Sequence, residues 1–502
     1  MKKPAYKWIA LSVTTIGSLM VAIDSTIVVL AVPNMLQDLH SDLVRITWVI
    51  MAYLMVSTVL LLSFGRMADM FGRVRLYNLG FVIFTIGSVL CGLASNDIVL
   101  IGARIIQGAG GAMLVANAMA IITEVFPPEQ RGQAMGFNSI TWGAGSVLGP
   151  VFGGLILAVA SWRWIFLVNL PIGIVATLAA YLLLHDIAPN PRGERFDLLG
   201  ALLFSVGLIG LLLGLTSSIG AGWFSPTVLA FFALAIVAFV AFVFWERHTP
   251  YPMLDLHLFD SHRYAFSVVA ATLQTLALFA LNFLLVFYLQ GVRGYSPLTA
   301  AFLILPLSLM ISICGPVGGR WADRDRFGGI TPVTIGLVLQ GAALVMLTTL
   351  TPTTSYVMLA LILVVMGVGG GLFWSPNTST TMGAAPRNRL GVASATLGTM
   401  RNVGMVCSFA LALAVAAASM PPALVNAVFL GTVGHLPSAT AFAFTSAMVH
   451  AFIASAVICV FAVIFSIMSV SKRGRVATSS TSSAASVPAE SPDEQAVSQD
   501  SA

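Results

Sequence analysis

Apolar runs long enough to cross a bilayer recur along most of this 502-residue chain, of which 58% is apolar and only 9% charged. A membrane-spanning helix needs about 20 such residues. The runs are uniformly apolar, whereas the strands of a membrane barrel are shorter and alternate in polarity. We therefore expect an all-α polytopic membrane protein with fourteen transmembrane helices, bounded by charged residues, Pro and Gly.

Lysine and arginine are distributed unevenly between the two sets of loops. One set, with both termini, holds nineteen of the 24 basic residues, and the other holds only Arg45, Arg163 and Arg293. Basic loops stay on the cytoplasmic side of a membrane. We therefore expect both termini to be cytoplasmic, and we assign the net charge of +5 to contacts with lipid headgroups rather than with nucleic acid.

A pentapeptide repeat indicates an internal duplication. Residues 65–69 read GRMAD and residues 319–323 read GRWAD, in loops that lie eight predicted helices apart. Two six-helix bundles would separate these loops by six helices, so two helices are inserted between the halves. Duplicated halves are typical of secondary transporters, which hold substrate between them near the bilayer midplane.

This 6+2+6 plan divides the chain into four parts. They are an N-terminal six-helix bundle (1–184), two inserted helices with cytoplasmic linkers (185–263), a C-terminal six-helix bundle (264–470) and a tail (471–502). The tail is rich in Ser, Ala and Pro with scattered acids, a composition typical of disorder. We expect a disordered cytoplasmic tail and a monomeric protein.

Asp24 is the one carboxylate predicted to lie deep within a membrane span. A charge at that depth costs about 2.5 to 3.5 kcal/mol even on lenient insertion scales, so such residues usually face a polar cavity and serve a function. The alternative is a capping or packing role, hydrogen-bonded to Ser25, Thr26 or a neighbouring helix.

Six segments together resemble the major facilitator superfamily, and within it the fourteen-span drug/proton antiporter family that includes QacA and EmrB. They are AIDSTIVVLAVP (22–33), GRMADMFGR (65–73), RIIQGAGGA (104–112), GSVLGPVFGG (145–154), SWRWIFLVNLPIG (161–173) and RNVG (401–404). The resemblance covers most of residues 8–470. It implies a proton-driven exporter that works by alternating access.

The resemblance assigns roles to three of these segments. The resemblance implies a cytoplasmic gate, in which charged contacts break and reform during transport. Its predicted residues are Gly65, Asp69, Gly72, Arg73 and Asp323. The alternative is a solvated basic loop with no gating role. We expect Asp69 to lie near the start of the third span, where the helix dipole favours an anion. The antiporter motif, expected between the two halves, comprises Gly145, Gly149, Pro150, Gly153 and Gly154.

Two arginines fall within predicted spans. The resemblance implicates Arg104 in proton transfer, with Asp24 as the carboxylate available to it; the alternative is that Arg104 only binds loop carbonyls. Arg401 and Asn402 match the family's RN pair, for which helix packing is as good an interpretation as transport.

Superfamily analogy places the first and fourth helix of each half around the substrate cavity. The polar and aromatic candidates there, with methionine as a soft apolar surface, are Met20, Met113, Asn117, Gln274, Asn282, Phe283, Phe287, Tyr288, Trp374 and Asn377. Helix packing is the alternative for each of them.

Ion-driven transport follows by elimination, because no lysine follows a GxxxxG loop that would bind ATP. We expect no cofactor, no metal and no enzymatic activity, since the spans contain neither HExxH nor GxSxG.

Some relatives carry a second carboxylate in the second span, where this chain has Met51. We therefore expect multidrug efflux of lipophilic neutral or monovalent cationic compounds. Export of an endogenous lipid or natural product is the first alternative, and a non-transporting membrane sensor is the second.

Overall fold

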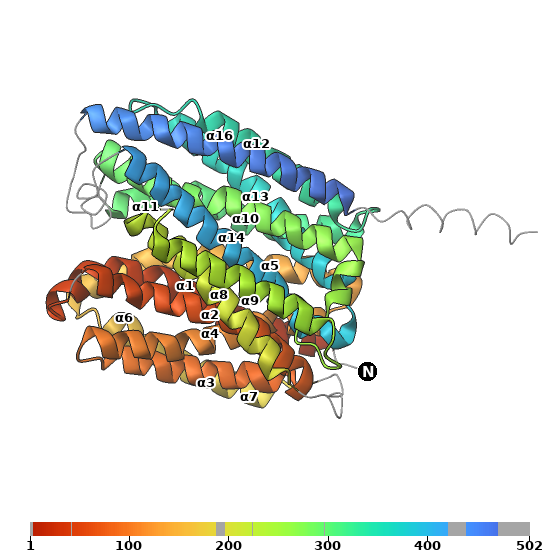
Figure 1. The fold of residues 1–502 in the computed structure, drawn as a ribbon. Helices are drawn as coiled ribbons and strands as arrows, with labels where there is room; N and C mark the ends of the chain where they lie inside the picture. The colour runs from red at the N-terminus through yellow and green to blue at the C-terminus, as the bar shows by residue number, and fades with distance from the viewer. Residues whose placement is uncertain are drawn as a thin grey trace, which may run out of the picture.

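A computed structural model of the chain describes residues 4–41, 43–186, 196–222, 224–295, 297–419 and 438–469. The predicted tail, 471–502, lies outside this range. In the described part the secondary structure is helical throughout (Figure 1). The first part contains α1 (Pro4–Asp38), α2 (Leu43–Phe71), α3 (Arg73–Gly92), α4 (Asp97–Val125), α5 (Pro128–Val159), α6 (Trp164–Leu167) and α7 (Asn169–Leu183).

Two helices follow before the chain enters the C-terminal part. They are α8 (Leu198–Ala221) and α9 (Pro226–Glu246). The remaining elements are η1 (Leu256–Asp260), α10 (His262–Phe287), the π-helical turn η2 (Tyr288–Val292), α11 (Pro297–Arg324), α12 (Ile330–Leu347), α13 (Tyr356–Ala384), η3 (Arg387–Arg389), α14 (Leu390–Ser419) and α16 (Ser438–Met468).

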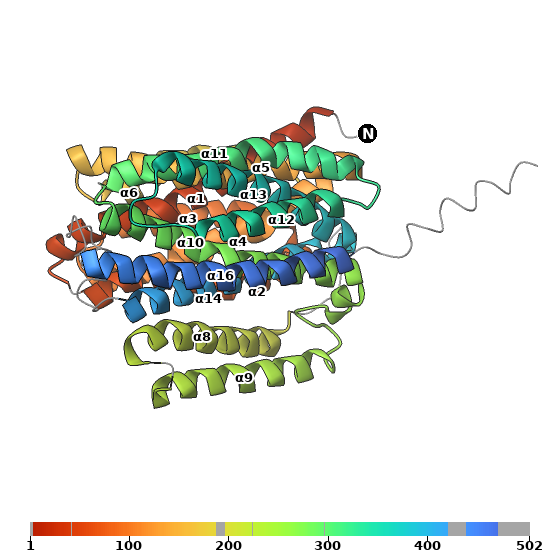
Figure 2. The same ribbon diagram turned by 90° about the horizontal axis from the view of Figure 1, so that it is seen from above.

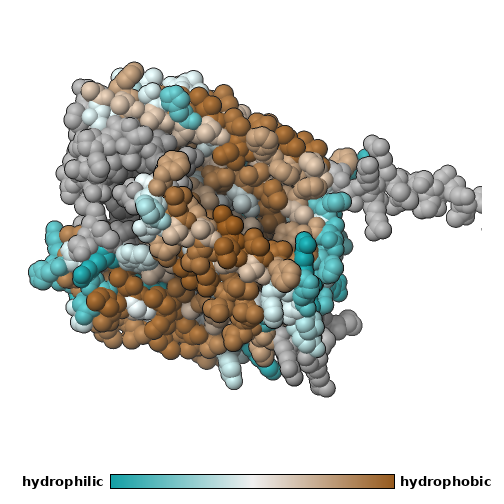
Figure 3. Space-filling model, viewed as in Figure 1, coloured by the Kyte–Doolittle hydropathy of each residue, from teal (hydrophilic) through white to brown (hydrophobic). Residues whose placement is uncertain are grey.

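An apolar belt surrounds the bundle. Hydrophobic residues cover the middle of the face shown in Figure 3, and hydrophilic residues gather towards its two ends. Among the described residues, twelve segments are long and apolar enough to cross a membrane, and the short α6 joins α7 in one of them. The protein is therefore a multi-pass membrane protein. The 32-residue α5 and the 30-residue α14 run in the same bundle but are not among the twelve.

Helices pack on one another both within each part of the chain and across the two parts. In the first part α1 packs on α5 and α4 packs on α2 and α3; in the last part α11 packs on α13 and α10 packs on α14 and α16. The two parts meet where α5 contacts α11 and where α2 contacts α14. Helices α8 and α9 pack on each other and lie as a pair at one edge, where α8 contacts α2 and α14 (Figure 2).

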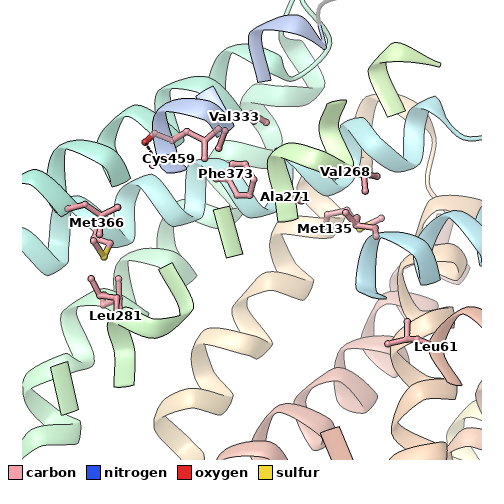
Figure 4. Packing of buried hydrophobic residues seen from close by; sticks show 14 of the residues in the cluster. Leu61, Met135, Val268, Ala271, Leu281, Val333, Met366, Phe373 and Cys459 are labelled. Atoms are coloured by element: carbon pink, nitrogen blue, oxygen red, sulfur yellow. Dashed lines mark hydrogen bonds between the residues drawn. The ribbon is translucent and has the colours of Figure 1, made fainter. Parts of the chain in front are cut away.

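The largest apolar core joins both parts of the chain. It includes Leu61 and Met135 from the first part, Phe204 from α8, and Val268 and Phe373 from the last part. Figure 4 shows several of these side chains filling the space between their helices. Burial of such side chains holds the two parts together independently of the charged contacts described below.

Glycine allows α3 and α4 to approach closely. A Cβ atom built on Gly110 would lie 2.6 Å from the Cα atom of Phe84, and one built on Gly87 would lie 2.6 Å from the Cα atom of Gln107. Small residues at such crossings let membrane helices pack backbone against backbone. The same crossing places Gln107 beside the polar cluster that contains Asp24.

We predict that Gly110→Ala separates α3 from α4 and lowers the free energy of unfolding by about 1 to 3 kcal/mol, as overpacking does elsewhere. Denaturant titration of the purified protein measures the change. Gly102→Ala on the same helix is the matched control, because a Cβ atom there would meet nothing within 4 Å. Equal stability of the two variants would contradict this packing.

Candidate functional site

Asp24 and Arg104 form an ion pair inside the first six-helix part. The Nη1 atom of Arg104 on α4 lies 2.7 Å from Oδ2 of Asp24 on α1, and the two side chains are 1% and 0% exposed. Removing one member of such a buried pair is strongly destabilising, because the other charge is left uncompensated. The structure therefore brings together the two residues that the sequence analysis singled out.

Neutral side chains complete the coordination of the Asp24 carboxylate. Its Oδ1 atom accepts hydrogen bonds from Nε2 of Gln107 at 2.8 Å and from Nδ2 of Asn169 at 3.2 Å. Both amides also donate to Oγ of Ser88, which in turn donates to the carbonyl of Phe166. The carboxylate thus holds three donors from two helices besides its own, α4 and α7.

Arg104 has three further partners. Its Nε atom donates to the carbonyl of Val49 at 3.1 Å and Nη1 also donates to Oε1 of Gln107 at 2.6 Å. The guanidinium lies over the ring of Tyr53, 4.1 Å from the centroid. Arg104 therefore pairs with the carboxylate and also binds a backbone carbonyl within α2, so it does not bind loop carbonyls only. Its role in proton transfer stays a prediction.

In this arrangement the charge of the Asp24 carboxylate can be compensated either by the Arg104 guanidinium or by a proton. When Asp24 is charged, Arg104 compensates it; when a proton neutralises Asp24, Arg104 keeps the carbonyl of Val49 and Oε1 of Gln107 as acceptors. A nearby cation favours the charged carboxylate and desolvation favours the neutral one. A small movement between α1 and α4 would shift that balance.

A second polar cluster joins the two parts of the chain at the end of α2. Oδ1 and Oδ2 of Asp69 accept hydrogen bonds from the backbone amides of Gly391 and Val392 at 2.8 and 2.9 Å. These amides open α14. The expectation that Asp69 serves the start of the third span is therefore wrong: its partner is the helix N-terminus of the other half, where free amides and the helix dipole attract an anion.

Arg73 also contributes to the contact between Asp69 and the start of α14. Its Nη2 atom lies 2.7 Å from Oδ1 of Asp69 and also donates to the carbonyl of Arg387 at 2.9 Å. Its Nη1 atom pairs with Glu124 at 3.0 Å. Arg73 thus pairs with Asp69 and also bridges the two halves.

Asp323 makes the equivalent contact in the repeat. At the end of α11 its carboxylate accepts hydrogen bonds from the amides of Gly132 and Gln133, at 2.7 and 3.0 Å, near the start of α5. Each carboxylate of the repeated pentapeptide thus binds the first turns of a helix in the opposite half. These paired contacts, centred on Asp69 and Asp323, are called the two latches below.

Glycine pairs let the helices of each latch approach closely. A Cβ atom on Gly65 would lie 2.6 Å from the carbonyl oxygen of Gly391, and Gly132 faces Gly319 in the same way. Gly72 has a different function, because its φ of 108° permits the sharp turn between α2 and α3. The carboxylate at the start of α3 is Asp186, which accepts a hydrogen bond from the amide of Val74 at 2.8 Å.

The glycines of the predicted antiporter motif pack mostly within their own half. Gly145 lies against Ala22 and Gly149 against Thr26, both on α1 next to Asp24. A Cβ atom on Gly154 would meet nothing within 4 Å. Gly153 is buried, and the side chain of Pro150 lies outside the described residues. The contact of α5 with the other half is made instead by its first half, which includes Gly132, Gly136 and Gly143.

Most candidate cavity residues have other partners. Met20 packs in the core of the first part with Tyr53 and Phe81, and Met113 lies against Gly80 of α3. These two residues therefore lie at helix interfaces, and their assignment to the cavity stays a prediction. The side chains of three further candidates, in α10, lie outside the described residues: Asn282, Phe283 and Phe287.

Three polar candidates are likewise bound to nearby backbone or amide groups. Asn117 donates to the carbonyl of Met113 on its own helix at 2.7 Å, and Gln274 donates to Gln340 at 3.4 Å. Tyr288 donates to the carbonyl of Thr351 at 2.7 Å, in the loop after α12. The hydroxyl of Tyr288 is thus bound at the end of the bundle, and its placement in the cavity stays a prediction.

Trp374 and Asn377 do come together, around Arg401. The guanidinium lies 4.5 Å from the centroid of the Trp374 ring, and its Nη2 atom donates to Oδ1 of Asn377 at 3.2 Å and to Oγ1 of Thr378 at 3.0 Å. Asn402 donates to Oγ1 of Thr58 at 3.1 Å, across the interface between the halves. The RN pair therefore takes part in a polar site rather than only in apolar helix packing.

The sequence analysis missed three residues of the first cluster, namely Ser88, Gln107 and Asn169. Gln107 stands three residues after Arg104 and so shares its helix face, a spacing that could have identified it. Asn169 and Ser88 join only through the packing of α7 and α3, which no local pattern predicts.

We predict that Asp69→Asn combined with Asp323→Asn opens the latched end, because each change weakens a charge-assisted contact with a helix N-terminus. Spin labels at Arg75→Cys and Arg326→Cys, in protein whose native cysteines are serine, should show a longer distance population. The matched control is Asp186→Asn, which removes a similar helix-start contact within one half. An unchanged distance distribution in the double variant would contradict the latch assignment.

Comparison with known proteins identifies the family. Residues 14–409 match the Major Facilitator Superfamily profile. The chain is 32% identical to the riboflavin transporter RibZ of Clostridioides difficile, over 81% of this chain and 86% of that protein. It is 31% identical to the tetracenomycin C resistance and export protein of Streptomyces glaucescens, over 79% and 73%.

The fold agrees with that identification. The human organic anion transporter MFSD10 (TETRAN) superposes with a TM-score of 0.59, covering 91% of this chain and 100% of that chain at 14% identity, a likeness that concerns the fold alone. The chain therefore belongs to the Major Facilitator Superfamily, and with relatives such as these it is a membrane transporter rather than an enzyme.

Proposed function

We propose that this chain is a proton-coupled antiporter that exports lipophilic compounds by alternating access. The observation that carries the proposal is the buried ion pair of Asp24 and Arg104, a carboxylate at bilayer depth with a cation that can replace a proton. Ionisable residues within a membrane commonly form proton relays in transporters.

The proposed cycle couples Asp24 to the two latches. With the latches closed, Asp24 is charged and bound by Arg104. Protonation of Asp24 releases Arg104 and loosens α1 from α4, which favours the other conformation. Proton release to the cytoplasm restores the pair.

Orientation of the chain follows from its basic loops. The latches lie at the end of the bundle that carries the loops rich in Lys and Arg, so in a membrane that obeys the positive-inside rule they close the cytoplasmic side. The described conformation is then closed on the cytoplasmic side. We place the protein in a bacterial cell membrane, as its bacterial relatives favour. We place both termini in the cytoplasm, as the distribution of basic loops favours.

We further propose that α5 and α14 cross the membrane with the twelve candidate segments. The chain then has fourteen spans in a 6+2+6 plan, with α8 and α9 as the inserted pair. Three observations support this: the lengths of α5 and α14, their packing along spanning helices, and the position of α8 and α9 at one edge of the bundle (Figure 2).

Efflux is supported by relatives whose names describe resistance and export, such as the tetracenomycin C protein. The membrane potential provides about 2.3 kcal/mol per charge per 100 mV, which sustains roughly a fiftyfold gradient of a neutral substrate exchanged for one proton. Export of an endogenous natural product is the second candidate, since the relative RibZ is named for riboflavin. Competition between drugs and riboflavin in vesicles separates the two.

We predict that Asp24→Asn abolishes substrate efflux driven by an imposed pH gradient in proteoliposomes, with at least a tenfold loss of rate, because the amide cannot exchange a proton. Substrate-dependent proton flux, followed with a pH-sensitive dye, should disappear with it.

The matched control is Asp38→Asn, which makes the same change on the same helix. Asp38 is half-exposed at the far end of α1, and its pKa is lowered by hydrogen bonds from Arg163 and Trp162. This variant should retain coupled efflux. Full pH-driven efflux by Asp24→Asn would refute the proposed function.

A further inference from the structure

Arg401 is a guanidinium deep in the bundle with no carboxylate partner among the described residues. It stands eleven residues after Leu390, about 17 Å along α14 at 1.5 Å per residue. In the sequence, residues 264–470 contain only two carboxylates, Asp323 and Asp325. Both are engaged elsewhere: Asp323 in its latch, and Asp325 with Gly329 and Thr331.

The acids of the first part do not compensate Arg401 either. Asp24 is paired with Arg104, and Asp69 is paired with Arg73 and the start of α14. A charged residue within a membrane usually pairs or marks a substrate pathway. Among the described residues, therefore, no carboxylate pairs with Arg401, and its partners Asn377, Thr378 and Trp374 are neutral.

The surroundings of Arg401 leave part of its guanidinium free. Its two hydrogen bonds both come from Nη2, to Asn377 and Thr378, and its Nε atom has no hydrogen-bond partner in the described residues. Arg401 and Trp374 are both half-buried rather than fully buried. An arginine with free donors in a fixed fork is suited to a carboxylate, sulfonate or phenolate group.

The Trp374 ring adds an aromatic surface beside the charge. The guanidinium lies 4.5 Å from its centroid, so a planar ligand that binds Arg401 would also contact this ring. Asn377 is itself fixed by a hydrogen bond to the carbonyl of Ser267 on α10, at 3.1 Å. The site is thus built on α10, α13 and α14.

The site also lies at the interface between the halves. Asn402, next to Arg401, donates to Thr58 on α2 at 3.1 Å. Movement of the halves would break this contact and change the access to Arg401, as expected for a substrate site in a transporter of duplicated architecture.

We propose that Arg401 and Trp374 bind the anionic group and the aromatic ring of a lipophilic aromatic anion, and that such anions are substrates of this transporter. The proposal rests on the proposed export function and replaces the cationic part of the expected substrate range. One anion exported for one proton imported moves two charges per cycle, whereas a neutral substrate moves one.

Binding of a matched pair of probes tests this site. Equilibrium dialysis of the purified full-length protein with 2-naphthalenesulfonate and 2-naphthalenesulfonamide compares an anion with a neutral molecule of nearly the same size. We expect the wild type to bind the sulfonate at least tenfold more tightly. Arg401→Gln should weaken sulfonate binding at least tenfold and change sulfonamide binding by less than threefold, and Arg401→Lys should keep part of the preference.

Retained sulfonamide binding shows that Arg401→Gln is folded. In a second test, Trp374→Leu should weaken the binding of both probes. Equal affinity of the wild type for the two probes, no saturable binding of either, or a preference that survives Arg401→Gln would overturn the proposal. Absence of pH-driven efflux by the wild-type protein would count against proton coupling. Equal affinity of the wild-type protein for the two probes would count against the Arg401 site.

Discussion

The buried ion pair between Asp24 and Arg104 constrains the whole N-terminal part. Two charges removed from water are tolerated only with good geometry and additional hydrogen bonds. Here α3, α4 and α7 supply those bonds through Ser88, Gln107 and Asn169. Close glycine crossings of α3 and α4, and of α1 and α5, bring these helices near enough. The helices of the first part thus pack around one carboxylate whose charge is compensated by Arg104.

The two halves are joined by a different use of the same chemistry. Asp69 and Asp323 each bind backbone amides at the start of a helix from the opposite half. Such contacts are strong while closed, yet water can replace the carboxylate's partners when the end opens. An apolar core that spans both halves keeps them associated meanwhile.

Sequence reasoning predicted the helical fold and the Asp24–Arg104 pairing, because apolar length and buried charge leave few alternatives. The repeated pentapeptide likewise located both latch carboxylates. It could not predict that Asp69 binds α14 instead of α3, since that depends on how the halves dock. The packing of Met20 and Met113 at helix interfaces was not predictable for a related reason: which side of a helix faces its neighbours depends on the rotation of that helix. Arg401 lacked a nearby acid already in the sequence, but its contact with Trp374 required the fold.

The central claim is that Asp24 gains and loses the transported proton as Arg104 leaves and returns. Infrared difference spectroscopy of the purified protein across a pH titration measures this directly. The account predicts a protonated-carboxyl band that appears on acidification together with opening of the latches, and that is missing from Asp24→Asn. A spectrum in which latch opening occurs with no Asp24-dependent carboxyl band would contradict it.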